Sequence, residues 1–373
     1  MDTTRATGDI TRLLRPDLLA MEGYEPIEPI DVLAEALGIP PERVVKLDGN
    51  ENPYGPSPSA LAALGDARSY HIYPDPLQRK VRRALAAYVG AEEDLIVAGA
   101  GSDELIDLVL RATLSPGDGV VNCVPTFGMY SFSTSVCGGR VFDVPRREDF
   151  TLDVPGIEEA VGQGAKVIFI ASPNNPTGNA VSLREVEALL ELGLLVVVDE
   201  AYVEFGGESL VSRVPERERL AVLRTFSKWA GLAGLRAGYG VFPPALASLL
   251  LRIKSPYNLN VAAQVAVLAS LEDLGVLRER IACLVAERER LFEGLGRIPF
   301  LRPYPSQGNF LLCRVEDLEA RWVRDRLAER GIFVRYFDTP LLRGHLRISV
   351  GLPEHTDALL RALNDLIATD SHR

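Results

Sequence analysis

The feature that most restricts the fold is a regular alternation, between residues 76 and 245, of short β-branched runs with longer segments of helical period. Such alternation predicts βαβ units and therefore a largely parallel sheet. Residues 182–192 illustrate the helical half of the pattern, because Ser182 and Glu185 have the spacing of a capping box ahead of an apolar face. We predict seven strands in one layer, with helices on both faces. They are expected at residues 95–98, 119–123, 140–144, 166–171, 194–199, 220–225 and 237–242.

A second, smaller α/β lobe is predicted after about residue 256. Two long helical segments, 261–274 and 276–296, precede strand-like runs at 310–314, 332–336 and 345–350. Residues 24–30 are expected to form an irregular arm, because Pro26 and Pro29 lack backbone donors. A chain of 373 residues is long enough for two such lobes. The expected division is an N-terminal arm with part of the small domain (1–45), a large domain (46–257) and a small domain (258–373).

Charge and composition exclude several classes of function. The formal net charge of −11 argues against a nucleic-acid partner. The N-terminus mixes Asp2 and Arg5 without an apolar signal core, and the longest apolar run, 192–198, is too short to span a membrane. Four scattered cysteines without a C-x-x-C pair indicate reduced thiols, and four scattered histidines give no metal-binding spacing. We therefore expect a cytoplasmic protein without a metal site.

A lysine with unusual surroundings lies in the segment R-T-F-S-K-W-A-G-L-A-G-L-R. Lys228 follows a predicted strand and precedes a glycine-rich turn. To bond covalently to a carbonyl carbon, a lysine must be neutral; lowering its pKa from about 10.4 to about 7–8 requires roughly 4 kcal/mol of desolvation or nearby positive charge. Phe226, Trp229 and Arg236 would supply both. Taken alone, a lysine in this position is more often an ordinary turn lysine.

An acidic residue ends the apolar strand L-L-V-V-V-D. Ligands bind at the carboxyl ends of strands in open α/β sheets, and a buried carboxylate requires a cation or several donors. Asp199 is therefore a candidate partner for a cationic ring nitrogen, with the phenol of Tyr202 close by. The alternative is a helix N-cap or a salt bridge to the neighbouring lobe.

Two turns follow other predicted strands at the same edge of the sheet. The turn S-P-N-N-P-T-G at residues 172–178 is either part of the ligand site or a plain tight turn. Residues 99–104 open a predicted helix that runs to about residue 113, and free amides at such a helix start bind phosphate. The third glycine and the downstream acid of a dinucleotide fingerprint are missing, which disfavours a nicotinamide dehydrogenase.

Taken together, these segments resemble the fold-type I aminotransferases, and specifically the histidinol-phosphate aminotransferase group, from about residue 46 to residue 350. The resemblance rests on seven segments in the expected order. These are N-E-N-P-Y-G-P (50–56), G-S-D-E (101–104), P-T-F-G-M-Y (125–130), S-P-N-N-P-T-G (172–178), D-E-A-Y-V-E-F (199–205), the lysine segment and H-L-R-I-S-V-G (345–351).

The resemblance implies pyridoxal 5′-phosphate as the cofactor. Lys228 would hold it covalently, Asp199 would pair with its ring nitrogen, and Tyr202 would act on its 3′-oxygen together with Asn175. Phe127 would stack on the ring, at a position where relatives often carry Tyr. Tyr54 would reach the site of the partner subunit in a homodimer. The residues implied for the cofactor phosphate are Ser102, Asp103, Ser227 and Arg236.

The same resemblance implies a phosphorylated substrate. Arg347 would receive the carboxylate of the amino donor and Arg335 the phosphate of histidinol phosphate, with Tyr24 and Asn52 as further substrate contacts. The expected reaction transfers an amino group from glutamate to imidazole acetol phosphate. The alternatives are an aromatic aminotransferase, a threonine-phosphate decarboxylase and, in a different class, a non-catalytic binding protein of the same fold.

Overall fold

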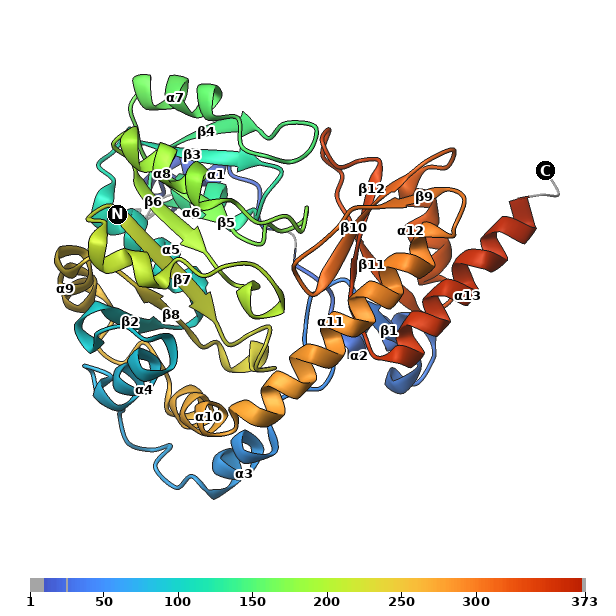
Figure 1. Ribbon diagram of the computed structural model, residues 1–373, viewed down its shortest axis with the longest axis horizontal. Helices are drawn as coiled ribbons and strands as arrows, with labels where there is room; N and C mark the ends of the chain where they lie inside the picture. Colours follow the sequence, from blue (N-terminus) through green and yellow to red (C-terminus); the bar gives the residue numbers. More distant parts are fainter. Residues whose placement is uncertain (1–9, 25, 371–373) are drawn as a thin grey trace, which may run out of the picture.

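The computed structural model describes residues 10–24 and 26–370, arranged as a larger and a smaller lobe that are bridged by one long helix, α11 (Leu274–Gly296) (Figure 1). Asp2 and Arg5, on which the expectation of no signal sequence was partly based, lie outside the described residues. Each lobe contains one β-sheet. None of the described helices combines the length and the apolar character needed to cross a membrane. Within the same residues, no group of three or more His, Cys, Asp and Glu side chains is placed to hold a metal ion.

The larger lobe contains the seven-stranded, mostly parallel sheet predicted from the alternation. Its strand order is β2-β8-β7-β6-β5-β3-β4, and only β8 runs antiparallel to its neighbours. The predicted positions are correct to within two residues at each end. The strands are β2 (Ile96–Gly99), β3 (Gly119–Val124), β4 (Arg140–Pro145), β5 (Ala165–Ala171), β6 (Leu195–Asp199), β7 (Leu220–Thr225) and β8 (Gly238–Val241).

Helices cover both faces of this sheet, as predicted, because its central strands are apolar on both sides. Buried side chains of α5 (Gly101–Thr113), α6 (Met129–Val136) and α9 (Pro244–Ile253) form one cluster. A second cluster lies on the other face and includes side chains of α4 (Arg79–Val89), α7 (Val154–Gly162), α8 (Leu183–Glu191) and α10 (Val261–Glu272). Helix α8 begins with the predicted capping box of Ser182 and Glu185.

The smaller lobe contains a five-stranded sheet of order β1-β11-β12-β10-β9. Three of its strands were predicted: β10 (Phe310–Val315), β11 (Ile332–Tyr336) and β12 (His345–Ser349). The other two, β1 (Val45–Leu47) and β9 (Leu301–Pro303), have three residues each and are too short to show a period. Residues 46–47 therefore pair within the smaller sheet, through β11, although the large domain was predicted to begin at residue 46.

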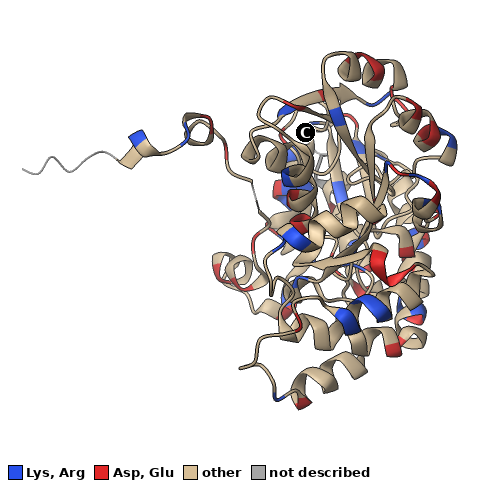
Figure 2. Cartoon of the chain, turned by 90° about the vertical axis from the view of Figure 1, so that its left-hand side faces the viewer, with Lys and Arg blue, Asp and Glu red and all other residues tan. Residues whose placement is uncertain are grey.

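The remaining elements surround these two sheets. The N-terminal segment contains η1 (Ile10–Leu13), which projects from the body (Figure 2), and α1 (Pro16–Leu19), before which Arg15 donates a 2.8 Å hydrogen bond to the carbonyl of Val136 in α6. Residues 21–24 and 26–29 have no regular structure, as expected for the arm. The other helices are α2 (Ile30–Leu37), η2 (Pro41–Arg43), α3 (Pro58–Asp66), η3 (Glu93–Leu95), η4 (Val203–Phe205), η5 (Val211–Glu216), η6 (Ala233–Leu235), α12 (Ala320–Ala328) and α13 (Pro353–Asp370).

Candidate functional site

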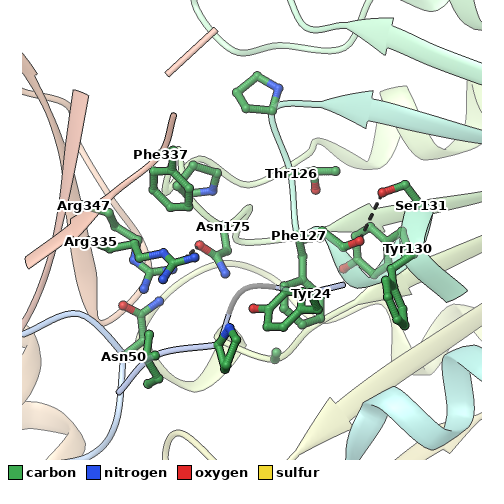
Figure 3. Close-up of a pocket in the computed structure, with 18 of the residues that line it drawn as sticks. Tyr24, Asn50, Thr126, Phe127, Tyr130, Ser131, Asn175, Arg335, Phe337 and Arg347 are labelled. Carbon is green, nitrogen blue, oxygen red and sulfur yellow. Dashed lines mark hydrogen bonds between the residues drawn. The ribbon is translucent and has the colours of Figure 1, made fainter. Parts of the chain in front are cut away.

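A cavity of about 1060 Å³ lies at the carboxyl ends of β5, β6 and β7 and is closed on one side by β11 and β12 (Figure 3). Strands of both lobes contribute to its wall, so it is lined by residues distant in sequence. Twelve of the fourteen residues predicted for the site line it. They are Tyr24, Ser102, Asp103, Phe127, Asn175, Asp199, Tyr202, Ser227, Lys228, Arg236, Arg335 and Arg347.

Lys228 follows β7 and directs its amine into the cavity. Its Nζ donates a 3.0 Å hydrogen bond to the carbonyl oxygen of Gly49 and lies 5.9 Å from the centre of the Tyr202 ring. Burial, followed by the positive charge of Arg347, lowers the pKa of Lys228 to about 8. Arg236, which the sequence suggested as the nearby cation, has a smaller effect than Arg347. The neutral amine is thus far more accessible near neutral pH than that of an ordinary lysine, and it predominates above about pH 8.

Asp199 ends β6 and is almost completely buried, with 4% of its surface exposed. Its Oδ2 accepts a 2.8 Å hydrogen bond from the hydroxyl of Tyr130, and its Oδ1 accepts a 3.1 Å bond from the amide of Ala201. Burial nevertheless raises the pKa of Asp199 to about 6. A cation beside this carboxylate would be strongly stabilised.

The start of α5 lines the cavity through Ser102 and Asp103. The first turn has no side-chain cap, which leaves amides free for an anion, and Arg236 lies beside it with its Nη2 2.6 Å from Asp103 Oδ2. A Cβ on Gly101 would come within 2.6 Å of that guanidinium, and one on Gly238 within 2.5 Å of the amide nitrogen of Ser102. Gly101 also has a φ of +82°, so both positions favour glycine, and the free amides beside a guanidinium suit an anion such as phosphate.

Two arginines lie side by side on the wall formed by the smaller lobe. Arg335 on β11 is the cross-strand neighbour of Arg347 on β12 (Figure 3). Arg347 donates a 2.7 Å hydrogen bond from Nη1 to Asn175 Oδ1, and its Nη2 donates to the carbonyl of Asp48. Burial and, to a lesser extent, the charge of Arg335 lower the pKa of Arg347. An anionic group bound here would relieve the repulsion between the two guanidinium groups.

Comparison with known proteins identifies the family. The family model for class I and class II aminotransferases matches residues 42–365. The chain belongs to this aminotransferase family. It is 54% identical over 366 residues to the histidinol-phosphate aminotransferase of Roseiflexus castenholzii, covering 96% of this chain and 99% of that protein. It is 50% identical over 362 residues to the chloroplastic histidinol-phosphate aminotransferase of Nicotiana plumbaginifolia, covering 96% and 87% respectively.

A solved structure supports the same assignment. The histidinol-phosphate aminotransferase of Sinorhizobium meliloti, in complex with pyridoxal 5′-phosphate, superimposes with a TM-score of 0.87 at 28% identity, covering 95% of this chain and 98% of that one. The fold-type I class predicted from the motifs is thereby confirmed, as is membership of the histidinol-phosphate aminotransferase group. Like its family, the enzyme depends on pyridoxal phosphate. The uncapped start of α5 beside Arg236 and the buried carboxylate of Asp199 fit that group.

Two residues predicted for the aminotransferase site do not line the cavity of their own chain. Asn52 is buried, and its Nδ2 donates a 2.9 Å hydrogen bond to the carbonyl of Trp229, next to Lys228. This geometry supports a role in holding the lysine loop rather than the expected substrate contact. Tyr54 lies beside Cys283 of α11, and burial together with this neighbour raises the pKa of Tyr54.

Asn50 and Tyr130 were overlooked in the sequence, although both line the aminotransferase cavity. Asn50 donates a 3.1 Å hydrogen bond from Nδ2 to the hydroxyl of Tyr202, and its Oδ1 accepts a 2.8 Å bond from Ser349 of β12. It thereby links the two lobes at the site. Both residues lie in motifs that were recognised, N-E-N-P-Y-G-P and P-T-F-G-M-Y, but no property of the motifs alone indicates which atoms they contact.

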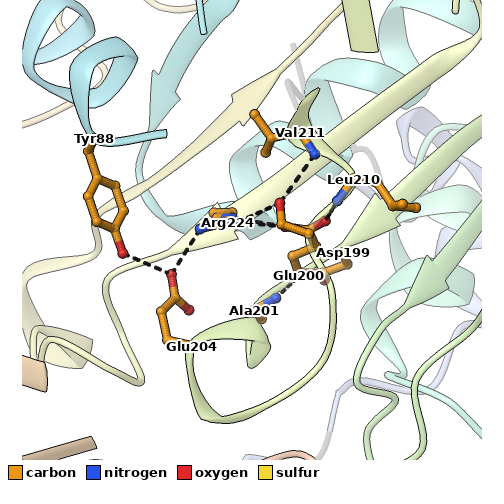
Figure 4. A network of polar contacts seen from close by, with 9 residues as sticks. Tyr88, Asp199, Glu200, Ala201, Glu204, Leu210, Val211 and Arg224 are labelled. Carbon is orange, nitrogen blue, oxygen red and sulfur yellow. Dashed lines mark hydrogen bonds and ion pairs between the residues drawn. The ribbon is translucent and has the colours of Figure 1, made fainter. Parts of the chain in front are cut away.

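A buried ionic network begins at Glu200, the residue that follows Asp199 (Figure 4). Arg224 of β7 pairs with Glu200 at 2.9 Å and with Glu204 at 3.2 Å, and the three side chains are at most 10% exposed. Tyr88 donates a 3.5 Å hydrogen bond to Glu204 and stacks on Trp229, with ring centres 5.5 Å apart. The network therefore connects β6, β7 and the residue that follows Lys228.

Proposed function

We propose that this aminotransferase transfers an amino group between glutamate and imidazole acetol phosphate, forming histidinol phosphate and 2-oxoglutarate, as the names of its relatives indicate for those proteins. The observation that carries the proposal is the pair of arginines opposite Lys228 in one cavity. A single arginine suffices for a carboxylate, whereas two adjacent guanidinium groups favour a phosphate dianion.

Lys228 holds the cofactor and then carries a proton. Bound pyridoxal phosphate supplies an electron sink that stabilises negative charge on the substrate α-carbon. Freed by the substrate, the amine of Lys228 would take up and return a proton at that carbon. A pKa of about 8 suits both tasks, because a catalytic base works best when its pKa is near the working pH.

The positions of the side chains in one cavity support the other cofactor contacts that we propose. Asp199 would hold the protonated ring nitrogen, Tyr202 and Asn175 would bind the 3′-oxygen, and Phe127 would lie against the ring. The first-turn amides of α5 bind the phosphate. The residues assigned to the phosphate are Ser102, Asp103, Ser227 and Arg236.

For the substrates, which occupy the site in turn, we assign the donor carboxylate to Arg347 and the phosphate of histidinol phosphate to Arg335, beside the then vacant Arg347. Tyr24 completes the cavity from the arm: it is about half exposed, and a Cβ at Gly128 would lie 3.8 Å from its ring. Its phenol is therefore available at the mouth of the cavity, where it would cap a bound phosphate.

We also propose that the enzyme is a cytoplasmic homodimer with shared active sites. Tyr54 does not reach the cavity of its own chain, which supports a role in the site of a second copy. The large and small domains are assigned to residues 46–257 and 258–373, with residues 1–45 as the arm and the start of the small lobe, except that residues 46–47 complete β1 of the smaller sheet.

The decisive experiment compares wild type and Arg335→Ala on histidinol phosphate, histidinol, phenylalanine and threonine phosphate, with detection of the keto product or of released CO₂. The proposal requires wild type to prefer histidinol phosphate and Arg335→Ala to lose roughly 10²-fold in kcat/KM on it, with little change on unphosphorylated amines. Equal losses would contradict the phosphate role. Preference for phenylalanine would identify an aromatic aminotransferase, and CO₂ release from threonine phosphate a decarboxylase.

A further inference from the structure

One aromatic side chain in the cavity is not explained by the function proposed above. Phe337 follows directly after β11 and lines the cavity beside both arginines (Figure 3). The centre of its ring lies 5.6 Å from Cζ of Arg335 and 5.8 Å from Cζ of Arg347. Both distances are within the range in which the negative face of an aromatic ring attracts a guanidinium group.

The backbone explains why these three side chains meet. Alternate residues of a strand point to the same side, so Arg335 and Phe337 share one side of β11. Arg347 is the cross-strand partner of Arg335 on β12 and therefore lies on that side as well. Two positive charges on directly opposite positions repel each other, and the ring is attracted to both.

The two arginines differ in burial. Arg347 is buried, donates hydrogen bonds to Asn175 and to the carbonyl of Asp48, and lies 5.7 Å from the Phe310 ring. Arg335 is only partly buried and stands at the strand end that leads into the exposed residues 338–341. A partly buried side chain has more room to move than a buried one, so removing the ring of Phe337 should change the direction of Arg335 more than that of Arg347.

We propose that Phe337 is a specificity-determining residue, which acts by positioning Arg335 beside Arg347 so that the cavity binds a phosphate group in preference to a neutral substituent. The inference rests on the proposed function and extends it. Phe337 itself forms no hydrogen bond to substrate; it sets the direction of the guanidinium that does. The chemical class it selects is a substrate that carries a phosphate dianion.

The test uses the enzyme loaded with cofactor and the variants Phe337→Leu, Phe337→Tyr, Arg335→Ala and Arg335→Ala/Phe337→Leu. We expect Phe337→Leu to raise the KM for histidinol phosphate about tenfold, with changes below about twofold in kcat and in the KM for histidinol. Phe337→Tyr, which keeps the ring, should stay close to wild type. In the Arg335→Ala background, Phe337→Leu should have no further effect, because its contribution depends on Arg335.

Phe333→Leu is the matched control, since Phe333 lies on the same strand, four residues earlier, pairs with Lys46 and does not line the cavity. It should leave both KM values unchanged. Equal increases for histidinol phosphate and histidinol in Phe337→Leu would overturn the proposal, as would a loss that simply adds to that of Arg335→Ala.

A binding measurement separates this inference from the proposed function. The Kd of inorganic phosphate, measured by calorimetry on the loaded enzyme, should rise about tenfold in Phe337→Leu and not in Phe337→Tyr or Phe333→Leu. An unchanged Kd would overturn the role of Phe337 whatever the natural substrate is. If instead wild type fails to prefer histidinol phosphate while the Kd still responds to Phe337→Leu, the proposed function fails and the inference stands.

Discussion

The hydroxyl of Tyr130 donates a 2.8 Å hydrogen bond to Oδ2 of Asp199, from α6 to the end of β6. This bond lowers the pKa of Asp199, in opposition to the larger effect of burial, and the outcome is a pKa of about 6. The aromatic ring of Tyr130 is itself fixed by stacking on Phe169, with ring centres 5.2 Å apart. Tyr130 therefore helps to keep Asp199 ionised at neutral pH, as required for a partner of a cationic ring nitrogen.

Replacing Tyr130 by Phe should shift cofactor binding to higher pH. Loss of the hydrogen bond raises the pKa of Asp199 further, so the carboxylate becomes protonated at a higher pH than in wild type. A hydrogen bond to a charged group contributes about 1.5–3 kcal/mol, which corresponds to roughly one to two pH units. The Kd of the cofactor is measured against pH on the apo-enzyme. We expect the pH below which affinity is lost to be higher than in wild type by about that amount.

The control for this shift is Tyr239→Phe. Tyr239 is fully buried in the same lobe, and its hydroxyl has no hydrogen-bond partner among the described residues. This variant should not change the pH below which cofactor affinity is lost. Coincident pH profiles for Tyr130→Phe and wild type would show that the hydrogen bond does not control Asp199.

Lys228→Ala should abolish the visible absorption of the purified enzyme, which we expect to be yellow, without unfolding the chain. The covalent link to the cofactor requires a neutral amine. Because the pKa of Lys228 is lowered to about 8, the rate at which wild-type apo-enzyme takes up the cofactor should increase with pH and level off above about 8. Absorbance measures the bound cofactor, and circular dichroism shows whether the chain is folded.

Lys166→Ala provides the comparison, since Lys166 is a surface lysine paired with Asp118 at 2.6 Å. It should retain the visible band and the pH dependence of wild type. Cofactor that stays attached to Lys228→Ala after borohydride reduction and dialysis would mean that another amine holds it.

Arg224→Met should destabilise the enzyme strongly at alkaline pH. The change leaves Glu200 and Glu204 buried without a cation, which costs about 3–5 kcal/mol in comparable cases. Burial already raises the pKa of Glu204 to about 7, and removal of Arg224 raises it further. A carboxyl group with a raised pKa loses stability as the pH increases through that value, so the loss should be larger at pH 8 than at pH 6.

Urea unfolding of Arg224→Met at these two pH values tests the expectation. Arg217→Met is the reference, because Arg217 pairs with Glu187 at 3.0 Å on the surface, where an ion pair contributes little. Equal losses in the two variants, or a loss in Arg224→Met that does not depend on pH, would contradict the role of the network.

The sequence by itself determined the architecture of the larger lobe. The β-branched runs, for example L-L-V-V-V-D before Glu200, are continuous because these strands are buried on both faces. The start of α8 was equally clear, since a capping box is a local hydrogen-bond pattern. The chemistry of Lys228 and Asp199 followed from strand ends, where residues distant in sequence meet at one edge of the sheet.

Only the tertiary structure decided the details that depend on contacts between the lobes. Strands β1 and β9 have three residues each, and β1 is ordered by pairing with β11 from the other end of the chain. Asn50 and Asn52 are two residues apart, yet one faces the cavity and the other holds the carbonyl of Trp229. A sequence period describes which residues are buried, but the partner of a buried polar atom is set by side chains that only folding brings within hydrogen-bond distance.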